Sequence, residues 1–99
     1  MRAEAKDAIV IGIVKHANQY GGWPHDWYVG ITENPIQRLY ADHRVDEENN
    51  HPIFKQALSV ADARAAEKEL LSYGCRGDTG GGANPDHVYA YKIASNTSE

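Results

Sequence analysis

The chain has 99 residues, with 10 Lys or Arg, 14 Asp or Glu and one cysteine, so its net charge at pH 7 is −4. This size supports one hydrophobic core, and the lone cysteine excludes an intrachain disulfide. We therefore expect a single domain over residues 1–99. A negative net charge gives no general attraction to nucleic acid, because non-specific affinity comes mostly from neutralised phosphates. Any role with nucleic acid must depend on a local patch.

The longest apolar run, residues 8–14, is far shorter than the roughly 20 residues that cross a bilayer, so we expect no membrane partner. The charged N-terminal segment is not followed by a signal-peptide cleavage pattern, which predicts a cytoplasmic location.

Two strands are predicted first, over Ile9–Val14 and Trp27–Thr32, because both segments are rich in β-branched or aromatic residues. The segment between them, Lys15–Asp26, contains glycine and proline and is predicted to be a loop. Together these segments predict a hairpin.

Helices are expected in the middle of the chain. Asn34 and Pro35 are typical of a helix start, so a helix is predicted over residues 36–45, with Ile36, Leu39, Tyr40 and His43 on its inner face. Pro52 predicts a short helix as far as Leu58. Ser59 and Asp62 have the spacing of a capping box, which predicts a helix over residues 60–73 that Gly74 ends.

The glycine-rich segment Cys75–Asp86 is predicted to be a flexible loop, and the alternation in His87–Ile93 predicts the last strand. The expected fold is therefore α+β, with a three-stranded antiparallel sheet and about three helices in the order β-β-α-α-α-β. Its core is expected to cover about residues 9–93, with flexible termini.

Four features follow one another in these elements: Gly12-Ile13-Val14 in the first strand, Tyr28-Val29-Gly30 in the second, Arg38 one turn into the first helix, and Glu67 shortly before Leu70-Leu71 in the third helix. This order resembles the GIY-YIG nuclease superfamily over roughly residues 9–93. The resemblance implies metal-dependent hydrolysis of phosphodiester bonds in DNA or RNA.

The resemblance also implies roles for three residues. Glu67 would hold Mg²⁺ or Mn²⁺, for which one carboxylate suffices because Mg²⁺ usually keeps several waters and takes phosphate oxygens as ligands. Arg38 would supply a permanent cation whose planar fork matches two phosphate oxygens. Tyr28 would orient water or phosphate, or act as the base.

The chain departs from the family pattern at the end of the first motif, where Val14 stands in place of tyrosine. Loss of a positioned general base slows catalysis by about 10²–10⁴-fold, so the resemblance implies a slow, rewired or inactive nuclease. Tyr20, His25 or His16 from the expected hairpin loop are candidate replacements. Asn84 is the only candidate for the late asparagine of the family.

Ordinary structural roles stay open for all three candidates. Arg38 has Asp42 four residues later and could form a helical ion pair, and Glu67 could pair with Arg64 on a solvated helix face. Tyr28 could simply pack beneath the helices.

Two other functions also stay open. One is a catalytically silent domain that binds or assembles, and the other is nucleotide or metabolite binding by the segment with Trp23 and Trp27 together with the glycine loop, Gly77–Gly82. Tyr89 and Tyr91 on the last strand could be exposed and support a dimer or could be core residues, so the sequence leaves monomer and homodimer open.

Overall fold

The computed structural model describes residues 2–77 and 83–99. Along these residues it contains α1 (Lys6–Tyr20), β1 (Trp27–Thr32), the π-helix η1 (Gln37–Asp42), α2 (Glu47–Asn50), β2 (Ile53–Gln56), α3 (Val60–Ser72), β3 (Arg76–Gly77) and β4 (His87–Lys92). The α+β class is confirmed. The described strands form a four-stranded mixed sheet, so the expected three-stranded antiparallel sheet and the order β-β-α-α-α-β are wrong.

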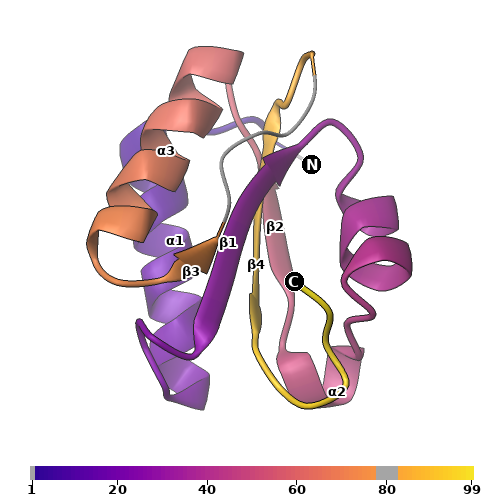
Figure 1. Cartoon of the computed structure of the whole chain (residues 1–99). Helices are drawn as coiled ribbons and strands as arrows, with labels where there is room; N and C mark the ends of the chain where they lie inside the picture. The colour runs from indigo at the N-terminus through magenta and orange to yellow at the C-terminus, as the bar shows by residue number, and fades with distance from the viewer. Residues whose placement is uncertain (1, 78–82) are drawn as a thin grey trace.

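The sheet has the strand order β2-β4-β1-β3, with β4 antiparallel to both neighbours and β3 parallel to β1. Figure 1 shows α1 and α3 on one side of the sheet and η1 on the other, with the C-terminal segment running between the sheet and η1. The two faces of the sheet are therefore covered by different layers. None of the described helices is long and apolar enough to span a bilayer.

The segment predicted as the first strand is helical. Ile9, Ile13 and Ala17 are fully buried at a spacing of four residues, while Ile11 is 60% exposed. This is the stripe of a helix, whereas a strand would bury Ile9, Ile11 and Ile13 on one face. Packing of this stripe against α3 and the sheet overrides the β-propensity of the branched residues, and α1 also takes in residues 15–20 of the predicted loop.

The segment after Pro52 is also different from its prediction. Residues 53–56 form β2 rather than a helix, and they pair with β4 so that Phe54 lies opposite Tyr89. Alternation explains the strand, because Ile53 packs on the helical layer and Phe54 packs on the opposite face.

The remaining helices agree better with the sequence. The hydroxyl of Ser59 accepts from the backbone N–H of Asp62 at 3.0 Å, so the cap of α3 is confirmed, and Gly74 has a φ of 113° just past its end. The helix predicted over residues 36–45 is present as the shorter, wider η1. Its predicted inner face is wrong at Ile36, which is 53% exposed.

The segment predicted as a flexible loop contains β3, and Gly77 in that strand lies against the backbone of β1. A Cβ at Gly77 would collide with the carbonyl oxygen of Val29, which explains glycine at this position. Residues 78–82 of the Gly77–Gly82 glycine loop, which the open alternative of nucleotide or metabolite binding includes, lie outside the described residues.

Candidate functional site

The sheet face opposite α1 and α3 carries a cluster of aromatic side chains. Tyr28 pairs with Tyr91 across the strands, and Gly30 pairs with Tyr89, so the alternation of strand residues brings the three phenols to one face. The ring of Tyr28 lies 5.3 Å from that of Tyr91 and 6.4 Å from that of Tyr89, with interplanar angles of 18° and 22°. We refer to Tyr28, Tyr89, Tyr91 and His43 as the tyrosine face.

Tyr89 and Tyr91 are almost completely buried because β4 is an inner strand of the sheet. They are core residues of this chain, and the alternative that they form an exposed dimerisation edge is wrong.

Gly30 makes room for the ring of Tyr89. A Cβ at Gly30 would lie 2.5 Å from Cζ of Tyr89 and 2.8 Å from Cε1, much closer than real contacts allow. The glycine of the Tyr28-Val29-Gly30 segment therefore lets the phenol of Tyr89 cross β1 beside Tyr28.

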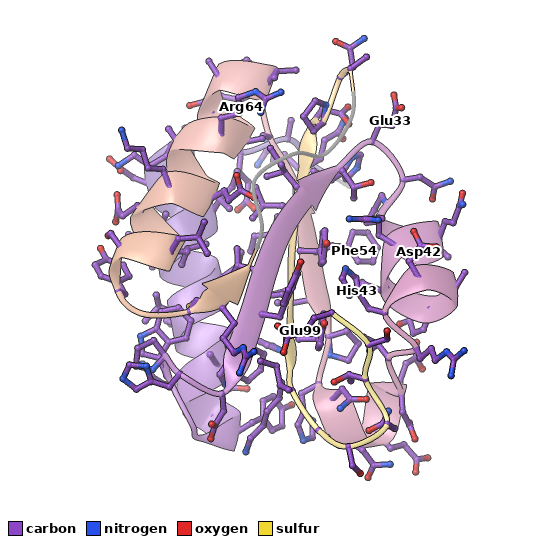
Figure 2. The ribbon with its side chains drawn as sticks, in the orientation of Figure 1. Glu33, Asp42, His43, Phe54, Arg64 and Glu99 are labelled. Carbon is purple, nitrogen blue, oxygen red and sulfur yellow. The ribbon has the colours of Figure 1, made fainter. Side chains whose placement is uncertain are left out.

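His43, which follows η1, joins this helix to the sheet. Its Nε2 lies 2.8 Å from the hydroxyl of Tyr89, and its Nδ1 lies 2.6 Å from the backbone carbonyl oxygen of Ser98. A carbonyl only accepts, so Nδ1 carries the proton and neutral His43 accepts from Tyr89 at Nε2. Figure 2 shows His43 and Phe54 between the sheet and η1.

The environment of His43 favours this neutral form. Burial lowers the pKa of the imidazole below its usual range, and the positive charge of Arg38 lowers it further, against the opposing effect of the Ser98 carbonyl. The oxygen of Tyr91 lies 3.1 Å from Nδ1 and accepts a second, longer bond from it. His43 is thus a neutral proton acceptor held by three groups.

Arg38 lies at the exposed rim of this face. Its guanidinium pairs with Asp42 at 3.2 Å, both side chains being 41% exposed, so the predicted helical ion pair is confirmed. The same positive charge also acts on Tyr89. Burial raises the pKa of this phenol to about 12, the Arg38 charge opposes the rise, and Tyr28 and Glu67 add to it.

Glu67 belongs to α3 and is only 5% exposed, so the interpretation as a solvated surface carboxylate is wrong. Its neighbours along the helix, Ala63, Ala66 and Leu70, pack in the core between α3 and the sheet. Its negative charge is one of the smaller contributions to the raised pKa of Tyr89. Tyr28 from β1, Arg38 from η1 and Glu67 from α3 therefore each influence the pKa of Tyr89.

The first-motif segment is not part of this site. Residues 12–14 belong to α1, which packs on the opposite face of the sheet, where half-buried Val14 lies against the core. A comparison of Val14 with a catalytic tyrosine therefore has no structural basis. The candidate replacements for the tyrosine are also elsewhere, since His16 and Tyr20 lie near His51 and His25 lies beside Gly74. Asn84, the candidate for the late asparagine of the family, is exposed.

The described residues contain no group of three or more His, Cys, Asp or Glu side chains that could hold a metal ion. Glu67 supplies one buried carboxylate, which suits Mg²⁺ held mainly by water and phosphate better than Zn²⁺. Burial raises the pKa of the Cys75 thiol to about 12, so this cysteine stays protonated and is a poor nucleophile.

Sequence reasoning missed His43, Tyr89 and Tyr91 as site residues. The available signal was the alternation of the last strand, which puts Tyr89 and Tyr91 on the same face, and the spacing of Leu39 and His43 on one helix. No protein-family model, curated protein or solved structure matches the chain, so its function has to be inferred from the geometry of its own residues.

Proposed function

We propose that the tyrosine face is the active site of a metal-dependent nuclease that hydrolyses phosphodiester bonds in DNA or RNA. One arrangement carries this proposal: the phenol of Tyr89 lies over Gly30 beside Tyr28, its hydroxyl is 2.8 Å from Nε2 of His43, and the charges of Arg38 and Glu67 both influence its pKa. The Tyr28-Val29-Gly30 segment, Arg38 and Glu67 support a divergent relationship to the GIY-YIG superfamily. Residues 12–14, which correspond to the first motif of the family, are helical here. Any such relationship therefore does not include the first strand that is usual in the family.

The proposed base is the pair formed by Tyr89 and His43. As an attacking water loses a proton to the Tyr89 oxygen, the phenolic proton moves along the 2.8 Å hydrogen bond to Nε2 of His43. The resulting imidazolium keeps its Nδ1–H on the Ser98 carbonyl. This relay needs neither a phenolate in the resting enzyme nor a tyrosine at position 14.

The three remaining groups, Arg38, Tyr28 and Glu67, stabilise the negative charge of the transition state. Arg38 is the exposed cation of the site, so it binds the phosphate first, and its guanidinium can face two phosphate oxygens. Tyr28 donates its hydroxyl to the phosphate or the attacking water. Glu67 would hold Mg²⁺ or Mn²⁺, and the ion would supply positive charge that stabilises the transition state.

The test is cleavage of supercoiled plasmid, single-stranded DNA and structured RNA with Mg²⁺ and with Mn²⁺. Glu67→Gln, Arg38→Ala and Tyr89→Phe should each reduce the rate by about 10²-fold or more. Glu48→Gln on α2 and Lys68→Ala on α3 remove exposed charges and should leave the rate unchanged. Equal cleavage by all proteins would indicate a contaminant and reject the proposal.

A catalytically silent binding module is the second candidate. It is favoured by the near-complete burial of Tyr89 and Tyr91 and by Ser98, whose N–H and carbonyl oxygen both bond to His43. In the same assay this candidate predicts no cleavage by folded protein in either metal, together with measurable binding of a labelled strand.

A further inference from the structure

A second cleft lies beside β2, the outer strand of the sheet. It has a volume of about 360 Å³ and is bordered by the end of α1, by η1 and by the segment from α2 into β2. Its walls include Tyr20, Tyr40, His51 and Phe54, with one carboxylate, Glu47. Aromatic walls with a small number of polar groups are the usual composition of a site for a small planar ligand.

Two of these rings already form a stack. Tyr20 and His51 lie 3.8 Å apart with an interplanar angle of 7°, the separation and angle of stacked bases. His51 has a left-handed backbone with a φ of 47°, and its carbonyl oxygen lies 2.7 Å from Nε2 of His16. A non-glycine residue held in this conformation indicates that its surroundings fix it.

The turn that carries His51 is anchored from below. Asn50 is fully buried, its Nδ2 donates to the carbonyl oxygen of Lys92 at 2.9 Å, and its Oδ1 accepts from the backbone N–H of Asp46 at 2.7 Å. These bonds tie α2 to the end of β4. The turn that carries His51 is therefore anchored before any ligand arrives, which reduces the entropy lost on binding.

The polar groups of the cleft suit one class of ligand. The carboxylate of Glu47 accepts from the hydroxyl of Tyr40 at 3.0 Å and has further acceptor capacity. Guanine is the base with two adjacent N–H groups on its Watson–Crick edge that a carboxylate can accept. Lys92 donates to the backbone carbonyl oxygen of Tyr20 at 2.8 Å, which puts a cation that could bind a phosphate at the end of α1.

We propose that this cleft binds one unpaired nucleobase of a single strand, with a preference for guanine. The inference rests on the proposed function, because Tyr40 and Phe54 also pack against the tyrosine face. A base in the cleft therefore lies next to the site at which the strand would be cut. Stacking supplies affinity for any base, and Glu47 supplies the preference.

The probe is a fluorescein-labelled ten-nucleotide thymidine strand with one central guanine or one central adenine, titrated by polarisation in EDTA so that no metal-dependent cleavage occurs. Tyr20→Ala should raise the Kd about tenfold or more, because it removes one stacking ring. Tyr20→Phe should bind like the wild type. Tyr73→Ala is the matched control, since Tyr20 is 40% and Tyr73 is 47% exposed, and Tyr73 lies outside the cleft.

Glu47→Gln should weaken binding of the guanine strand about tenfold and leave the adenine strand unchanged, so that the preference is lost. Equal effects of Tyr20→Ala and Tyr73→Ala, or no binding by folded wild-type protein, would overturn the inference. Failure of the nuclease proposal can be distinguished from failure of the base-binding proposal, because cleavage and binding are measured in separate assays. Binding that depends on Tyr20 without cleavage keeps the cleft as a binding site, whereas cleavage with binding independent of Tyr20 rejects the cleft alone.

Discussion

At the scale of single residues, His43 connects the stability of the fold to the proposed chemistry. Burial lowers its pKa, so the unfolded chain takes up a proton more readily than the folded protein does. Protonation therefore favours the unfolded state, and the contribution of neutral His43 is complete above the ordinary histidine pKa of about 6.5. It is lost progressively as the pH falls from that value through the lower pKa of the folded protein.

We expect the free energy of unfolding to decrease as the pH is lowered from about 7.5 to about 5, and His43→Gln to flatten this dependence. Urea denaturation at a series of pH values measures both. His25→Gln is the control, because His25 is exposed, and it should keep the wild-type slope. Identical slopes for wild type and His43→Gln would show that another group causes the dependence.

The candidate site was only partly predictable from individual residues. Tyr28, Arg38 and Glu67 could be selected because their order along the chain resembles a known family. Tyr89 could not be selected, because its position over Gly30 depends on the pairing of β1 with β4. These two strands are far apart along the chain. The role of His43 likewise could not be predicted, because its Nδ1 is held by the carbonyl oxygen of Ser98, 55 residues later.

At the scale of elements, the first helix is the main failure of sequence reasoning. The run of branched residues in 9–14 suits a strand or a buried helix, and only the extension of the apolar stripe to Ala17 distinguishes the two. The segment after Pro52 shows the reverse error: a helix was predicted and a strand is present. Four residues are too few to distinguish the two-residue period of a strand from the period of about 3.6 residues of a helix. By contrast, the caps at Ser59 and Gly74 are local chemistry and were predicted correctly.

A pair of substitutions tests the helix directly. Ile13 is fully buried and Ile11 is 60% exposed, so Ile13→Ala should lower the free energy of unfolding by about 2–5 kcal/mol and Ile11→Ala should change it by at most about 0.5 kcal/mol. Urea denaturation of both variants is the measurement. A strand would place both side chains on one face, so similar losses for the two variants would contradict the helical assignment.

At the scale of the whole molecule, the sheet separates the packing of the main apolar core on one face from the proposed active site on the other. The face under α1 and α3 is filled by apolar residues, most of them small or branched and one of them Trp27, whereas the opposite face holds tyrosines, His43 and the rim cation Arg38. Packing on the first face can stabilise the strands without restricting the chemistry on the second. Glu67 belongs to the first layer but acts electrically on the second.

The proposed metal ion would bind only the folded protein, so its binding can be measured as a change in the stability of the fold. A ligand that binds only the folded protein raises the free energy of unfolding, by about 1.4 kcal/mol at ten times its Kd. Millimolar Mg²⁺ should therefore raise the thermal midpoint of the wild type by several degrees, EDTA should reverse the rise, and Glu67→Gln should abolish it. Differential scanning fluorimetry in sodium salt of matched ionic strength measures the shift.

Glu48→Gln separates this effect from general screening of the negative chain. It removes an exposed carboxylate of α2 and should keep the full Mg²⁺ shift, because screening depends on the total charge and a bound ion depends on one side chain. Equal shifts in wild type, Glu67→Gln and Glu48→Gln would mean that Mg²⁺ acts only by screening. Glu67 would then be a buried charge near Tyr89 without a metal, and the tyrosine face would be better explained as a binding surface than as a nuclease site.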